Sequence, residues 1–124
     1  PKIRHPLPDY SEPDREETYR GLKIVVKRHP RLGHYCGYVH VPEGHVVYGQ
    51  VDFDPRVHGG ITWDSYDSIP GFREIGFDCA HLGDYTPSIF DLPQRADEHF
   101  WTPDEVMAET RRLADQVLDG VKED

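Results

Sequence analysis

Five side chains in this sequence could do acid–base or metal chemistry: His45, His58, Asp78, His81 and Asp84. An aspartate can orient an imidazole and stabilise its charged form, which makes the histidine a usable general acid or base near neutral pH. Two histidines with carboxylates can instead bind a divalent transition metal, and zinc and manganese suit this ligand set best. We therefore expect His58, Asp78 and His81 as catalytic residues, or His58, Asp78, His81 and Asp84 as metal ligands.

A ligand at this site would need space as well as polar groups. Gly59 and Gly60 directly follow the first candidate histidine, and glycines leave room for a ligand or for close approach of the backbone. Together with His45 and Asp84 they are the expected ligand-binding residues. A bulge or a packing role is the alternative for the glycine pair, because no P-loop lysine or helix start follows it.

Ordinary structural explanations remain open for the polar residues. A hydrogen-bonded pair of His58 and Asp78 could simply stabilise a small domain, since buried polar groups are usually paired. Asp78 could also cap the turn that carries His81, and His45 could be a surface turn residue after Gly44. The sequence does not choose between these explanations and a catalytic or binding role.

Several enzyme classes are not indicated, because the chain has no HExxH, GxSxG or GxGxxG motif. Cys79 stands beside Asp78 as a potential nucleophile, but an acidic neighbourhood raises the pKa of a thiol and argues against that role. Cys36 and Cys79 are the only cysteines, too few for a disulfide framework. We expect both to be reduced and to serve as small core residues.

Charge and hydropathy limit the partners. The 124 residues carry a formal net charge of -9 with histidine neutral, so the chain repels a phosphate backbone and nucleic acid is not an expected partner. The best basic cluster, Lys23, Lys27, Arg28 and Arg31, is expected to be a solvated strand face and turn. No apolar run approaches the roughly 20 residues that span a bilayer. We therefore expect a cytoplasmic protein without membrane contact, whose oligomeric state the sequence does not fix.

These residues must be positioned by a single domain. The pattern predicts an extended N-terminal arm over residues 1–19 and one α+β domain over residues 20–124. Short apolar or alternating runs predict strands over residues 22–27, 35–41, 46–48, 57–63 and 72–79.

The clearest element lies near the C-terminus. Thr102-Pro103-Asp104-Glu105 is a capping box with proline at the first helical position, and Gly120 supplies a stop. The helix between them has one apolar stripe, which it cannot bury alone. The expected fold is a mostly antiparallel sheet of about five short strands with this single amphipathic helix packed on it.

The last two predicted strands are joined by a short loop, so an antiparallel hairpin is their natural pairing. Pairing of Trp63 near Glu74 or Arg73 would place His58 opposite Asp78 or Cys79, with Cβ atoms roughly 5 Å apart. Trp63 would then point into the core, and His58 and Asp78 would share the polar face.

Three blocks together resemble a known group of sequences: Gly44-His45-Val46-Val47-Tyr48-Gly49, Val57-His58-Gly59-Gly60-Ile61-Thr62, and Gly76-Phe77-Asp78-Cys79-Ala80-His81-Leu82-Gly83-Asp84. The chain is similar to a family of small uncharacterised proteins encoded by bacteriophages and prophages. The resemblance implies a host-cytoplasm setting and a role for the histidines and aspartates in the last two blocks. No activity carries over from that family.

The leading hypothesis is a phage-type accessory protein whose His/Asp pocket binds, or also hydrolyses, a small phosphate- or nucleotide-like ligand. Two alternatives remain. The chain could be a non-enzymatic acidic protein that docks on a host protein by charge complementarity, or the His/Asp network could be purely structural.

Overall fold

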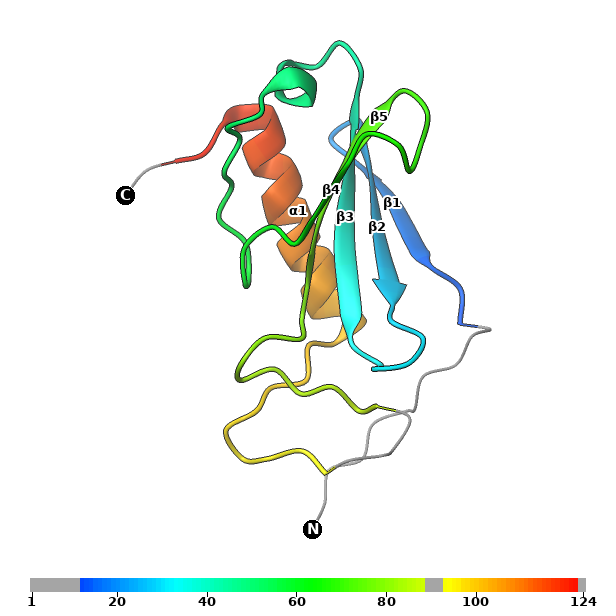
Figure 1. Ribbon diagram of the computed structural model, residues 1–124, viewed down its shortest axis with the longest axis vertical. Coiled ribbons are helices and arrows are strands. Elements are labelled where there is room, and N and C mark those ends of the chain that lie inside the picture. The colour runs from blue at the N-terminus through cyan, green and yellow to red at the C-terminus, as the bar shows by residue number, and fades with distance from the viewer. Residues whose placement is uncertain (1–11, 89–92, 123–124) are drawn as a thin grey trace.

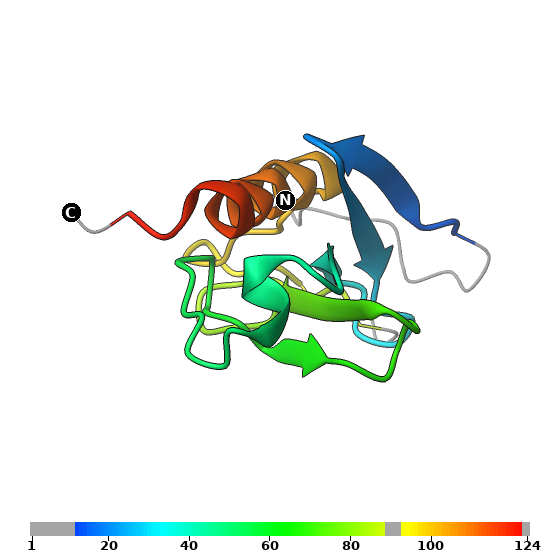
Figure 2. The ribbon, with the colours of Figure 1, turned by 90° about the horizontal axis from the view of Figure 1, so that it is seen from above.

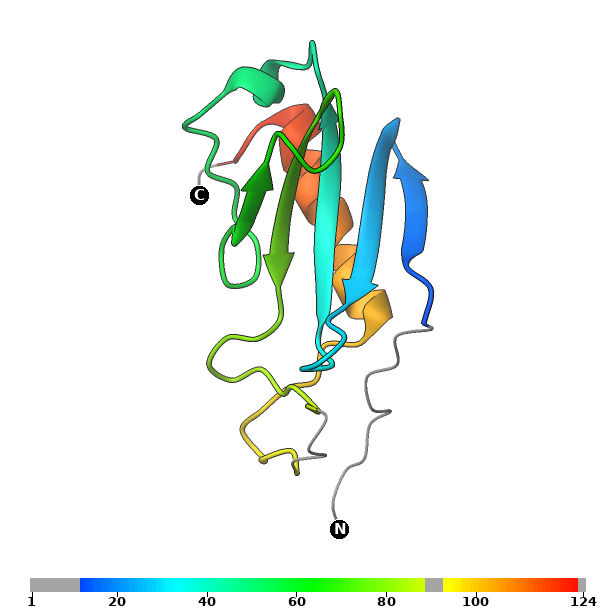
Figure 3. The same ribbon diagram turned by 45° about the vertical axis from the view of Figure 1, so that its right-hand side comes forward.

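The computed structural model describes residues 12–88 and 93–122. Its elements, in chain order, are β1 (Arg15–Tyr19), β2 (Leu22–Arg28), β3 (Tyr35–Pro42), the 3-10 helix η1 (Val46–Gly49), β4 (Trp63–Ser65), β5 (Phe72–Asp78) and α1 (Pro103–Asp119). The strands form one antiparallel sheet in the order β1-β2-β3-β5-β4, and α1 packs on one of its faces (Figure 1, Figure 3). The predicted α+β fold is therefore confirmed.

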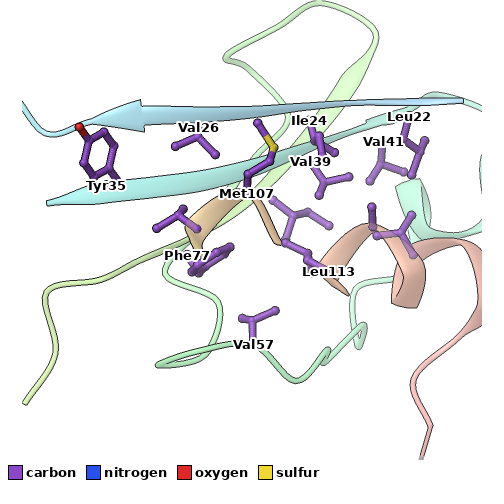
Figure 4. Close-up of a cluster of buried hydrophobic side chains, with 14 of the residues drawn as sticks. Leu22, Ile24, Val26, Tyr35, Val39, Val41, Val57, Phe77, Met107 and Leu113 are labelled. Carbon is purple, nitrogen blue, oxygen red and sulfur yellow. The ribbon is translucent and has the colours of Figure 1, made fainter. Parts of the chain in front are cut away.

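Apolar side chains at alternate positions of the central strands form the core. Leu22, Ile24 and Val26 of β2 are buried and lie on the side of the sheet that α1 covers (Figure 4). Leu113 of α1 is completely buried among them and the apolar residues of β3 and β5. Because full burial of one aliphatic side chain contributes about 1.5–3 kcal/mol, this cluster is the main source of the stability of the fold.

The helix begins at the predicted capping box. The Thr102 hydroxyl accepts the Glu105 N–H at 3.2 Å, and the Glu105 carboxylate accepts the Thr102 N–H at 3.0 Å. Gly120 follows the last helical residue, as predicted. Gly37 of β3 lies beneath Thr110, and a Cβ at this position would collide with the Thr110 hydroxyl. A glycine there thus allows α1 to approach the sheet closely.

β1 lies inside the segment that was predicted to be an arm, so the boundary at residue 19 is corrected: residues 15–19 belong to the sheet. β1 is an edge strand tied to α1 by charge. Arg111 donates from two nitrogens to the two carboxylate oxygens of Glu17, both at 2.7 Å. Such contacts across most of the chain length leave no local pattern in the sequence. Residues 1–11 of the predicted arm lie outside the described residues.

Two of the predicted strands are wrong in whole or in part. Residues 46–48 belong to the 3-10 helix η1, and residues 57–62 form no strand, so that only Trp63 of that prediction lies in β4. For residues 57–62 the cause is the glycine pair. Gly59 and Gly60 have φ angles of +70° and +79°, and the Gly60 amide donates to the carbonyl three residues earlier at 2.9 Å. This turn ends any extended run before β4 begins.

The register of β4 also differs from the prediction. Trp63 pairs with Gly76 and not with Glu74. Directly opposed residues share one face of an antiparallel sheet, so Trp63 points away from the core and is 46% exposed. Residues 57–62 form no strand, so this register does not extend to His58; the His58 ring lies beside that of His81, with ring centroids 5.8 Å apart.

The two faces of the sheet have different surroundings. α1 covers one face, and within the described residues no helix lies on the other, as Figure 2 shows from above. The fold thus offers two places for a site: the end of the sheet where β5 stops, and the face turned away from α1. No helix in the described part of the chain is long and apolar enough to cross a membrane.

Candidate functional site

Several segments far apart in sequence meet where β5 ends. The turn at residues 57–60 lies against the loop after β5, and the two are joined by contacts of His58 with His81 and Asp84. The strand-like bridge between Asp84 and His99 then fixes the segment that leads into α1. We name His58, Asp78, His81, Asp84 and Trp101 the His58 cluster.

The shortest polar contact in the cluster joins His58 and Asp84. His58 Nε2 lies 2.7 Å from Asp84 Oδ2 and 2.9 Å from Oδ1. The Asp84 side chain is only 3% exposed, and it also accepts the backbone N–H of His81 at 2.9 Å. From the other side, the backbone N–H of His58 donates to Glu109 of α1 at 2.7 Å. Both the backbone and the ring of His58 are therefore fixed.

This arrangement leaves the second nitrogen of His58 free. A carboxylate only accepts hydrogen bonds, so Nε2 carries the hydrogen and Nδ1 holds the lone pair. Within the described part of the chain, Nδ1 makes no hydrogen bond, and the His58 side chain is 24% exposed. The ring packs on Trp101 with centroids 4.3 Å apart and an interplanar angle of 34°. The indole holds one face of the imidazole while its edge stays accessible.

His81 is the second imidazole of the cluster. Its ring lies over Gly59, where any Cβ would collide with it, and its centroid is 5.8 Å from that of His58. His81 Nε2 lies 3.1 Å from Asp78 Oδ1, yet it is buried without a well-aligned hydrogen bond. Asp78 also accepts the Ala80 N–H at 3.1 Å, as expected for a residue that caps the turn carrying His81.

The structure thus changes the predicted pairing. His58 was predicted opposite Asp78, but its carboxylate partner is Asp84, and Asp78 lies beside His81. The cause is the turn at Gly59 and Gly60, which takes His58 out of the strand, together with the turn from His81 to Asp84, in which the Asp84 amide donates to the His81 carbonyl at 2.8 Å. The predicted residues are brought together, but as two His–Asp pairs with exchanged partners.

Burial shifts the pKa values of two other titratable groups near the cluster, His34 and Cys79. His34 is buried with Nδ1 unpartnered; its pKa is lowered to about 4, chiefly by burial and then by its neighbour His29. Burial also raises the pKa of the Cys79 thiol well above its ordinary range, and the carboxylate of Asp84 adds to this effect. Cys36 and Cys79 are free and buried, as predicted.

The geometry does not favour the metal hypothesis. Among residues 12–88 and 93–122, no group of three His, Cys, Asp or Glu side chains is arranged to hold a metal ion. Of the four proposed ligands, His58 and Asp84 satisfy each other, whereas His81 Nε2 lies beside Asp78 without a well-aligned hydrogen bond.

His45 does not belong to this site. It follows β3, whose first residue, Tyr35, lies near the end of β5 and whose last residue, Pro42, lies roughly 20 Å away at about 3.3 Å per residue. The His45 Nδ1 accepts the Val47 N–H at 3.1 Å and caps η1. The predicted ligand-binding role of His45 is therefore corrected to the structural role of a turn residue. Gly59 belongs to the site as the backing for His81.

Three contributors were missed from the sequence. Trp101 and Glu109 lie more than 40 positions from His58, and neither belongs to a pattern that signals such a contact. His34 was not among the candidate residues, although it is buried near the cluster. Comparisons of the chain with protein-family models, with curated proteins and with solved structures find no match. Its function is therefore argued from geometry.

Proposed function

We propose that His58 is a general acid–base group acting on a small ligand at this end of the sheet, with Asp84 as the residue that positions it. One observation carries the proposal. The buried Asp84 carboxylate accepts from Nε2 of His58, while Nδ1 has no hydrogen-bond partner among the described residues and the His58 side chain is 24% exposed. An imidazole held this way keeps one tautomer and presents the lone pair of its other ring nitrogen to a ligand.

Hydrolysis by a bound water is the reaction that this arrangement supports best. His58 Nδ1 would remove a proton from a water molecule as the oxygen attacks an ester carbonyl, and would return that proton to the leaving alkoxide. A covalent route through a thiol is disfavoured, because burial holds Cys79 protonated. General acid–base assistance of this kind is worth roughly 10²–10⁴-fold in rate.

The charges of the cluster bear on the choice of ligand. Its described contacts supply three carboxylates, those of Asp78, Asp84 and Glu109, and the Arg112 guanidinium beside them is already bonded to both oxygens of Glu109. A phosphate- or nucleotide-like ligand, which the sequence suggested, would meet an excess of negative charge there. A neutral ester fits the charge balance better, so we propose a neutral ligand first and a phosphate ester second.

The test is turnover of 4-nitrophenyl acetate and 4-nitrophenyl phosphate by the wild type and three variants. His58→Gln removes the base, and Asp84→Asn weakens its positioning. His45→Asn is the control, because it removes a histidine at the far end of β3 and keeps a side chain that can cap η1. We expect acetate turnover to fall in the first two variants and to stay unchanged in the control. Equal rates in the wild type and all three variants would overturn the proposal.

One observation favours the second function suggested by the sequence, binding of a host protein by an acidic chain. Val46 and Val51 are 78% and 89% exposed, and Val46 borders a hollow of about 660 Å³ between η1 and the end of α1. Exposed apolar side chains within an acidic surface suit a basic, partly apolar partner. A photo-crosslinker at position 51 should capture one such partner, and Val46→Asp should abolish the product; a product that survives this change would count against the idea.

A further inference from the structure

The face of the sheet turned away from α1 carries a second group of polar and aromatic side chains, separate from the His58 cluster. A hollow of about 410 Å³ lies on this face. Small-molecule sites commonly enclose about 300–1,000 Å³, so its size suits a ligand of one or two rings. Its principal lining residues are Lys23, Lys27, Tyr38, His40, Trp63 and Glu74.

The strand register explains why these residues meet. Tyr38 of β3 pairs with Gly76 of β5, which pairs in turn with Trp63 of β4. One step further along, His40 pairs with Glu74. Since directly opposed residues project from the same side of a sheet, the two rows form one continuous surface that crosses three strands.

A buried polar group lies at the base of the hollow. The side chains of His40 and Glu74 are each only 7% exposed, and His40 Nε2 lies 2.9 Å from Glu74 Oε2. The other oxygen of Glu74 accepts the indole N–H of Trp63 at 2.8 Å. The carboxylate therefore uses both oxygens inside the protein. His40 keeps Nδ1 as an acceptor, and this atom is not among the buried polar atoms that lack a partner in the described chain.

The aromatic residues leave apolar surface uncovered. Trp63 is 46% exposed although its only polar atom already donates to Glu74. The exposed part of the indole is therefore hydrocarbon and π surface, which solvent does not satisfy. The Tyr38 ring lies across Gly76, where any Cβ would collide with it. Burial raises the pKa of the Tyr38 phenol well above its ordinary range, so this ring stays neutral.

The charges at the rim favour a single negative charge on the ligand. Lys23 is paired with Glu16 at 3.3 Å, in an exposed pair that largely offsets itself. The Lys27 ammonium lies 5.6 Å from the centre of the Tyr38 ring and makes no ion pair within the described residues. One cation beside an aromatic ring suits one carboxylate. A polyanion would also meet Asp14 and Glu16 at the same rim.

We propose that this hollow binds a small aromatic carboxylate, in addition to and independently of the ligand of the His58 cluster. The ring lies on the exposed surfaces of Trp63 and Tyr38, the carboxylate faces Lys27, and a donor group on the ring bonds to Nδ1 of His40. Aromatic contact area supplies most of the affinity, and the lysine selects the charge.

The test uses 1-naphthoate as the probe and follows the two indole N–H signals by NMR, with Trp63→Phe to assign them. We expect naphthoate to shift the Trp63 signal saturably and to leave the Trp101 signal in place. Cyclohexanecarboxylate carries the same charge without a π face, and 1-naphthalenemethanol carries the same rings without the charge. Both should bind more weakly.

Two variants separate the contribution of the Lys27 charge to naphthoate binding from any contribution of the His58 cluster. Lys27→Gln should weaken naphthoate by up to about fivefold, the worth of an exposed ion pair, and should leave naphthalenemethanol unchanged. His58→Gln should leave naphthoate binding unchanged, so a failure here is distinguishable from a failure of the acid–base proposal. The inference would be overturned by equal binding of naphthoate and cyclohexanecarboxylate, or by a response confined to Trp101.

Discussion

A pair of adjacent glycines provides a sharp test of how the His58 cluster is built. Gly59 and Gly60 both have positive φ, +70° and +79°, so alanine is strained at either position. Only at Gly59 would the new Cβ collide with the ring of His81; at Gly60 nothing lies within 4 Å. Gly60→Ala is therefore a matched control for Gly59→Ala, since it carries the same backbone strain without the collision.

The magnitudes follow from these two effects. An alanine in the left-handed region costs about 1–2 kcal/mol, and both variants should lose this much unfolding free energy. In Gly59→Ala the His81 ring must also leave its position over the turn. A side chain forced about 30° from its rotamer costs roughly 0.5–1.5 kcal/mol. We therefore expect Gly59→Ala to be about 1 kcal/mol less stable than Gly60→Ala.

Urea unfolding monitored by circular dichroism measures the free energies, and histidine side-chain NMR reports on the two rings. In Gly59→Ala the resonances of His81 and its neighbour His58 should both shift, and in Gly60→Ala neither should move appreciably. Equal destabilisation of the two variants with unchanged His81 resonances would refute the packing of His81 on the turn.

Three further predictions concern burial. The folded pKa of His34, about 4, lies below its ordinary value of 6.5. Its contribution to the free energy of unfolding should therefore be complete above about pH 6.5 and should fall by up to about 3 kcal/mol as the pH drops to about 4. Urea unfolding across this range should show a smaller loss of stability in His34→Gln than in the wild type, and an identical loss would contradict the burial of a neutral His34. Burial raises the pKa of the Cys36 thiol to about 11 and that of the Cys79 thiol further. Both thiols should therefore react with a disulfide reagent at pH 8 only after denaturation. Rapid labelling of the native protein would contradict the burial of these two side chains. Gly37→Ala should destabilise the fold by about 1–3 kcal/mol through overpacking against Thr110. In a double-mutant cycle, adding Thr110→Ala should recover part of that loss. Strictly additive losses in the two single variants would rule the contact out.

The elements that the sequence predicted well are those with local causes. β2 and β3 follow from runs of alternating apolar residues, and α1 follows from its capping box, its apolar stripe and Gly120. β1 had no such signature. Its residues are mostly polar, and what holds it is pairing with β2 and the bond between Glu17 and Arg111. Those partners lie elsewhere in the chain, so no local window contains them.

The candidate site divides in the same way. Residue types and spacing indicated the histidines and aspartates, but the partner of each was decided by how distant segments fold together. The turn at Gly59 and Gly60 takes His58 out of the strand, beside His81 and with its Nε2 on Asp84. Spacing along the chain does not fix which carboxylate an imidazole meets once a glycine turn interrupts the strand.

By itself the sequence determined the α+β class, the extent of the helix and the kinds of side chain available for chemistry, because periodicity and capping act over a few residues. Only the tertiary structure decided that His58 pairs with Asp84, that Trp101 packs on its ring and that Trp63 faces the uncovered side of the sheet. These outcomes depend on strand register and on contacts between distant segments, where a shift of one residue exchanges the faces of a strand.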